Sequence, residues 1–82
     1  MDTRALTEKI VLNLVTNQEA VSVKEFPSDD ENTTVIEVLV AEEDMGRVIG
    51  KSGKTAAAIR TLVQASSALH DNKYVKINFD KF

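Results

Sequence analysis

The sequence predicts an α+β fold in which three helices pack on one face of a mixed three-stranded sheet. Apolar residues recur with helical spacing in three segments. Two other segments alternate apolar with polar residues and one is rich in β-branched residues, which gives the order helix, strand, strand, helix, helix, strand. A short polar turn joins the first two strands, which favours antiparallel pairing. The helical pair before the last strand is long enough for the crossover that makes the second and third strands parallel.

Each predicted element has a local signal. In chain order the expected segments are helix 2–15, strand 21–26, loop 27–32, strand 33–40, helix 42–49, loop 50–53, helix 54–69 and strand 74–79. The first helix has an apolar stripe in which Leu6, Ile10 and Leu14 recur every four residues. Asp2 or Thr3 can cap its first turn.

The strands and the long helix define the expected core. The first strand is expected to end at Pro27, whose ring and missing N–H discourage further pairing. The strand 33–40 is rich in β-branched residues and should be the most buried. The long helix is expected to contribute a core stripe formed by Ile59, Leu62 and Val63.

The composition indicates one small domain, residues 1–82, with 43% hydrophobic residues and no cysteine. There is neither an apolar run long enough to cross a bilayer nor a signal-peptide pattern, so we expect a cytoplasmic protein without a membrane partner. His70 is the single histidine and has no neighbouring ligand set, so we expect no metal site, no cofactor and no catalytic residue. Glu42, Glu43 and Asp44 are explained as the first turn of a helix, where negative charge favours the positive end of the dipole.

The charged residues are segregated along the chain. The formal net charge is −3, which argues against non-specific coating of nucleic acid. No acidic residue lies between Asp44 and Asp71, whereas this segment holds Arg47, Lys51, Lys54 and Arg60. The pattern indicates a local cationic surface on an acidic protein, although basic residues on a solvated helix would look the same.

The most informative segment is GRVIGKSGKT, from Gly46 to Thr55. A Gly-x-x-Gly turn between two helices exposes its backbone without side chains at the glycines, so a polyanion can approach the N–H groups that open the second helix. Lys51 and Ser52, at the middle positions, suit phosphate contact. The alternative is that the glycines only make a tight turn.

A nucleotide-binding P-loop is a second competing interpretation. It needs a glycine five positions before the Gly-Lys-Ser/Thr triplet. For Gly50-Lys51-Ser52 that position is Met45, and for Gly53-Lys54-Thr55 it is Val48. Both registers fail.

The block GRVIGKSGKTAAAIRTLV resembles the signature of KH domains, specifically of the small bacterial KhpA-type RNA-binding proteins. Val48-Ile49-Gly50 before the loop and Ile59-Arg60 after it fit the family's spacing, and the resemblance covers essentially the whole chain in the type II order α-β-β-α-α-β. The four aromatic residues form no stacking strand of the kind that an RRM needs.

The resemblance implies that the loop holds the backbone of about four nucleotides of single-stranded RNA. Apolar residues and the last strand would border a groove for the bases, with 27–32 as the variable loop; its Asp29-Asp30-Glu31 is not expected to contact phosphate. The residues expected to bind RNA are Arg47, Val48, Ile49, Gly50, Lys51, Ser52, Gly53, Lys54, Ile59 and Arg60.

The resemblance also implies self-association, or partnership with a larger KH-containing protein of the KhpB type. It further implies a role as an RNA chaperone, in post-transcriptional regulation or in coordinating growth and envelope synthesis. Two other hypotheses remain open. One is a protein-interaction or dimerisation module with lost or weak RNA binding, which the acidic net charge favours; the other is an enzyme acting on phosphorylated substrates, supported only by the failed P-loop match.

Overall fold

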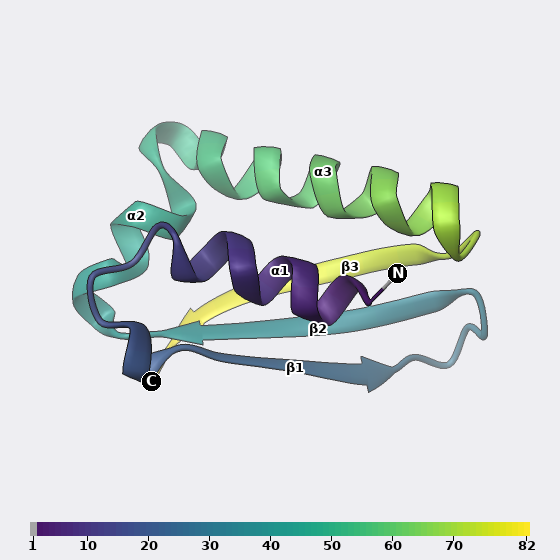
Figure 1. The fold of residues 1–82 in the computed structure, drawn as a ribbon, viewed down its shortest axis with the longest axis horizontal. Coiled ribbons are helices and arrows are strands. Elements are labelled where there is room, and N and C mark those ends of the chain that lie inside the picture. The colour runs from purple at the N-terminus through teal and green to yellow at the C-terminus, as the bar shows by residue number, and fades with distance from the viewer. Residues whose placement is uncertain (1) are drawn as a thin grey trace.

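The computed structural model describes residues 2–82. Within that range α1, α2 and α3 lie on one face of a three-stranded sheet, as predicted (Figure 1). The elements are α1 (Thr3–Leu12), the 3₁₀ turn η1 (Gln18–Ala20), β1 (Ser22–Pro27), β2 (Thr33–Val40), the 3₁₀ turn η2 (Glu42–Asp44), α2 (Met45–Ile49), the 3₁₀ turn η3 (Lys51–Gly53), α3 (Lys54–His70) and β3 (Tyr74–Lys81). None of the helices in 2–82 combines the length and apolar character needed to cross a membrane.

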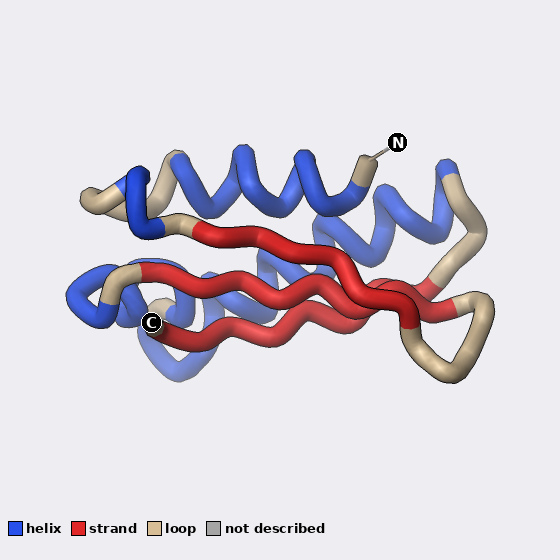
Figure 2. The backbone as a smooth tube through the Cα atoms, turned by 90° about the horizontal axis from the view of Figure 1, so that it is seen from below, coloured by secondary structure: helices blue, strands red, loops and turns tan. Residues whose placement is uncertain are grey.

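The sheet is mixed, which confirms the predicted topology. Its strand order is β1-β2-β3, and the three strands lie side by side in Figure 2. Strand β1 is antiparallel and β3 parallel to the central strand β2, as the arrows in Figure 1 show. Val38 of β2 lies opposite Val23 of β1 and Phe79 of β3. Both β1 and β3 are therefore edge strands, and the outer edge of β3 is free to contribute to a groove.

The core lies between the sheet and the helices. Alternate residues of β2, namely Ile36, Val38 and Val40, have no exposed surface, because a strand presents every second side chain to the same face. This confirms that β2 is the most buried strand. The helices complete the core with residues that include Val11, Val48, Ile59 and Val63.

Helix α1 begins as predicted but ends earlier than residue 15. Asp2 is its N-cap, and its Oδ1 accepts a hydrogen bond from the Ala5 N–H at 3.1 Å. The last helical residue is Leu12, and the side chain of Asn13 donates to the Lys9 carbonyl at 2.7 Å. The helical spacing of the apolar residues continues past this point, but the backbone after the helix is held by a distant side chain, described below.

Three other sequence predictions need correction. Pro27 is the last paired residue of β1, opposite Thr34, because it lies on an edge strand that tolerates a missing donor. Strand β3 continues beyond residue 79 to Lys81. Leu62 is 55% exposed and does not belong to the core stripe of α3, whose buried residues are Ala56, Ile59, Val63 and Ser67.

Candidate nucleic-acid interface

The turn between α2 and α3 requires glycine at both ends. Gly50 ends α2 with φ 76° and ψ 173°, and its N–H donates to the Gly46 carbonyl at 2.9 Å. This is a positive φ with an extended ψ, so Gly50 does not adopt the left-handed helical conformation that glycine commonly takes at the end of a helix. Gly53 does adopt it, with φ 75° and ψ 12°.

The two glycines differ in what surrounds them. A Cβ at Gly50 would collide with the Thr55 hydroxyl and would lie 2.7 Å from Thr55 Cβ and 2.8 Å from Thr55 N. A Cβ at Gly53 would meet no atom within 4 Å. Gly50 is therefore required by both its φ and close packing, whereas Gly53 is required by φ alone.

The two middle residues of the loop, Lys51 and Ser52, are exposed. Ser52 has φ 56° and ψ 28°, a left-handed conformation that non-glycine residues rarely adopt. Within residues 2–82 the side chains of Lys51, Ser52 and Lys54 make no hydrogen bond or ion pair. The loop thus presents unpaired cationic and hydroxyl groups beside the first N–H groups of α3, an arrangement that suits an anion.

The two arginines of the predicted site have different surroundings. The guanidinium of Arg60 donates from Nε to the Ile77 carbonyl of β3 at 3.2 Å and lies 5.1 Å from the centroid of the Phe79 ring. Arg60 is thereby held along the outer edge of β3. Arg47 is on α2, with its side chain 52% exposed, and contacts Asp44 Oδ1 at 3.4 Å.

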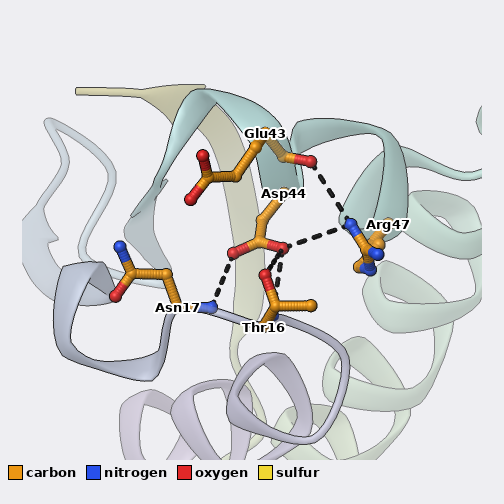
Figure 3. Close-up of polar contacts among 5 residues, drawn as sticks. All are labelled: Thr16, Asn17, Glu43, Asp44 and Arg47. Atoms are coloured by element: carbon orange, nitrogen blue, oxygen red, sulfur yellow. Dashed lines mark hydrogen bonds and ion pairs between the residues drawn. The ribbon is translucent and has the colours of Figure 1, made fainter.

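Asp44 is the main residue that sequence reasoning misinterpreted. It lies in η2 rather than in a helical first turn, and it has no exposed surface. Its Oδ1 accepts hydrogen bonds from the N–H and hydroxyl of Thr16, and its Oδ2 accepts one from the Asn17 N–H (Figure 3). These backbone hydrogen bonds lower the pKa of Asp44 against the opposing effect of burial, with smaller contributions from the Thr16 hydroxyl and Arg47.

The contacts of Asp44 anchor the chain that follows α1 to the start of α2. Thr16 and Asn17 do not continue α1, because their N–H groups donate to this carboxylate and not to carbonyls of the preceding turn. The same carboxylate precedes the helix that carries Arg47 and ends at Gly50. Asp44 therefore positions the loop without belonging to its surface.

The apolar residues predicted to border a groove are mostly internal. Val48 is fully buried and Ile59 is 4% exposed, so they belong to the core. Ile49 is half-buried and packs against that core. Val48 and Ile59 support the loop from beneath and do not form an open wall.

A groove lies instead between α3 and the outer edge of β3. One cavity of about 450 Å³ is lined by Arg60, Thr61, Gln64, Ala65, Ala68 and Val75. A second, of about 340 Å³, is lined by Asn32, Gln64, Ala68, Asn72, Lys73 and Tyr74. Both include Gln64 and Ala68, so the two cavities adjoin along α3, and together they are called here the α3–β3 groove.

Sequence reasoning missed most residues of this groove. Their signal is the i, i+4, i+8 spacing of Arg60, Gln64 and Ala68, which places them on one face of α3 beside the core stripe. The loop 27–32 contributes one residue, Asn32, to the end of the groove that is farthest from Gly50–Gly53. Asp30 serves the turn itself, since its carboxylate accepts from the Asn32 N–H at 2.9 Å and the Thr33 hydroxyl at 3.2 Å.

An α-β-β-α-α-β chain with a Gly-x-x-Gly turn between α2 and α3 defines a KH domain of type II. The sequence profile of the family described as "KhpA/KhpB, KH domain" matches residues 4–78. The chain belongs to this KhpA/KhpB family of KH domains, as the sequence predicted.

Curated relatives are similar over most of their length. The chain is 49% identical over 70 residues to RNA-binding protein KhpA of Caldanaerobacter subterraneus subsp. tengcongensis, covering 85% of this chain and 89% of that one. It is 40% identical over 74 residues to RNA-binding protein KhpA of Thermotoga maritima, covering 90% and 93%.

Solved structures share the fold. A variant of Aquifex aeolicus Era bound to GDP·AlF4⁻ matches with a TM-score of 0.67 and 20% identity over 96% of this chain. Era in complex with MgGDPNP and nucleotides 1506–1542 of 16S ribosomal RNA matches with the same TM-score and identity. The chain spans 29% of the length of each of these structures, and the likeness is one of fold alone.

Proposed function

We propose that this protein binds a short segment of single-stranded RNA, with the loop Gly50–Gly53 holding the sugar–phosphate backbone. One observation carries the proposal: both glycines take positive φ, which leaves the flanks of the loop bare, while Lys51 and Ser52 stand exposed and unpaired between them. Several similar proteins are named RNA-binding proteins, which supports RNA as the ligand.

The surrounding residues extend this site. Lys54 is seven residues, or about two helical turns, before the groove residue Thr61, so both side chains lie on the same face of α3. Arg60 on α3 and Arg47 on α2 add positive charge on either side of the loop. The bases would enter the α3–β3 groove, with Ile49 as the accessible apolar residue near the loop. The proposed cellular role is that of a non-enzymatic RNA chaperone or post-transcriptional regulator in the cytoplasm.

The test compares wild type with Lys51→Asp/Ser52→Asp by fluorescence anisotropy of labelled single-stranded RNA at two salt concentrations. Wild type should bind, with affinity that falls steeply as salt rises, because phosphate contacts release counterions. The folded loop variant should lose binding. Lys24→Asp/Lys76→Ser is the matched control, since it changes net charge equally at exposed positions on β1 and β3. Equal binding by wild type and the loop variant would contradict the proposal.

Self-association is a second candidate function, favoured by the outer face of α3. Leu62 and Leu69 are 55% and 79% exposed and lie seven residues apart. Ala58 is exposed on the same stripe, which carries no charge and lies away from the core face of α3. A two-fold axis would pair this stripe with itself in a second copy of the chain, and pairing two RNA sites would raise their weak individual affinity.

Sedimentation velocity measures this association directly. Wild type should sediment as a dimer at micromolar concentration, and Leu62→Asp should be monomeric yet folded. The matched control is Ala5→Asp, which makes the same change of net charge at an exposed position of α1. A monomeric wild type, or a dimer that ignores Leu62→Asp, would rule out this surface. A larger KH-containing protein of the KhpB type could use the same stripe in a heteromer.

A further inference from the structure

We propose that the end of the α3–β3 groove farthest from the loop is a second subsite, which binds one unpaired RNA base by stacking on Tyr74. This inference rests on the proposed RNA binding and extends it beyond the nucleotides held at the loop. The distal subsite is formed by Asn32, Gln64, Ala68, Asn72, Lys73 and Tyr74.

The loop and the distal subsite lie at opposite ends of α3. The loop precedes the first residue of α3, Lys54, whereas Asn72 and Tyr74 follow its last residue, His70. A helix of 17 residues is about 25 Å long, so the distal subsite lies well beyond the loop itself. The cavity beside Arg60 lies on the loop side of the distal subsite and shares Gln64 and Ala68 with it.

The backbone at the distal subsite is fixed by side chains of α3. Gln64 accepts from the Val75 N–H at 2.8 Å and donates to the Lys73 carbonyl at 3.3 Å. The Ser67 hydroxyl donates to the same carbonyl at 2.9 Å, and the Tyr74 N–H donates to the Asn32 carbonyl at 2.8 Å. The subsite is therefore preorganised, and the groups left to meet a ligand are side chains.

Those side chains have the chemistry of a base-binding site. Tyr74 is 68% exposed at the start of the edge strand, so a face of its ring is available for stacking. The amides of Asn32 and Asn72 make no hydrogen bond to the rest of 2–82 and can donate to, or accept from, a base edge. Asn72 has φ 54°, and Ala68 adds little bulk, which leaves space beside the ring.

Charge distinguishes this groove from the other cavities of 2–82. Neither groove cavity has a carboxylate in its lining, and each contains a cation, Lys73 or Arg60. By contrast, the two cavities on the β1 side include carboxylates, among them Glu25, Asp30 and Asp71, beside the same Lys73. A polyanion would be repelled from those and accepted along the α3–β3 groove, and Lys73 can contact the phosphate of a stacked nucleotide.

The test uses RNA length. A four-nucleotide RNA fills the loop site alone, and an RNA of about ten nucleotides also reaches the distal subsite. Tyr74→Ala should weaken binding of the longer RNA about tenfold and leave the shorter RNA unchanged, because base–aromatic stacking is lost only there. Tyr74→Phe should behave as wild type. Phe26→Ala is the control, because it removes an exposed aromatic ring from β1, at the opposite edge of the sheet from the groove.

Tyrosine fluorescence of the wild-type protein provides a second test of the distal subsite. Tyr74 is the single tyrosine and there is no tryptophan, so intrinsic fluorescence reports this ring alone. After correction for absorption by the RNA, the longer RNA should quench it and the shorter should not.

Three outcomes would overturn the subsite: no quenching by the longer RNA, no loss of its affinity in Tyr74→Ala, or equal loss for both lengths. Failure of Lys51→Asp/Ser52→Asp to weaken the four-nucleotide RNA would instead contradict the proposed loop function, so the two failures are distinguishable.

Discussion

The Oδ1 atom of Asp44 accepts two hydrogen bonds from Thr16, from its N–H at 3.0 Å and from its hydroxyl at 2.9 Å. The two residues are 28 positions apart, so this contact connects the end of α1 to the start of α2. The arrangement fixes where the loop-bearing helix begins relative to the rest of the core.

Protonation of Asp44 should therefore destabilise the fold. Its folded-state pKa is lowered below the unfolded value of about 3.9, so its contribution is fully present above that pH and is lost as pH falls through the folded pKa. Urea unfolding should show Asp44→Asn less stable than wild type near pH 6. The difference should shrink below about pH 4, where wild type loses the same charge.

Glu43→Gln is the control for this titration. Glu43 is the exposed neighbour, and its carboxylate makes no contact within residues 2–82, so its removal changes net charge equally. Its unfolding curves should stay close to those of wild type. A stability difference for Asp44→Asn that is constant from pH 6 to pH 3 would contradict the account.

The two loop glycines should differ in their tolerance of alanine. Gly53→Ala should lower the free energy of unfolding by about 1–2 kcal/mol, the cost of a left-handed alanine. Gly50→Ala should cost about 3 kcal/mol or more, since the collision with Thr55 adds to the strain of its backbone. Chemical denaturation of both variants measures the difference, and equal costs would show that Thr55 moves away.

Gly46 should behave in the opposite way. It is a helical residue of α2, and a Cβ there would meet no atom within 4 Å. Gly46→Ala should raise the free energy of unfolding by up to about 1 kcal/mol, because alanine loses less backbone entropy in a helix. Destabilisation in the same denaturation experiment would mean that Gly46 has a contact or strain that the structure does not show.

Ile59 and Leu62 provide a matched pair on α3. Ile59 is 4% exposed, so Ile59→Ala should cost about 2–5 kcal/mol. Leu62 is 55% exposed, and Leu62→Ala should change stability by no more than about 0.5 kcal/mol. Thermal and urea unfolding measure both changes, at a low protein concentration where self-association is minimal. Similar losses of stability in the two variants would mean that α3 is oriented differently from this account.

The periodic features of the fold were predictable from the sequence. Strand β2 is rich in β-branched residues, α3 has helical spacing, and the short turn between β1 and β2 dictates antiparallel pairing, so the topology followed from local pattern. The position of the Gly-x-x-Gly turn was also predictable, because glycine at two positions three residues apart is a strong local signal.

The rest depended on tertiary contacts that no local pattern encodes. Leu62 has the spacing of a core residue, but α3 turns the face that carries Ile59 and Val63 toward the core and leaves Leu62 exposed. Asp44 looked like an ordinary helix-opening acid, and only the fold brings Thr16 to it. The α3–β3 groove required knowing that Tyr74 and Arg60 lie along one edge, which depends on how α3 packs on β3.

The most direct test of the central claim is an NMR titration of ¹⁵N-labelled protein with single-stranded RNA. Chemical-shift changes should concentrate at Gly50–Lys54 and continue along the α3–β3 groove through Arg60 and Gln64. Changes confined to the uncovered face of the sheet, or no changes at Gly50–Lys54 on saturation, would contradict the assignment of the loop as the RNA site.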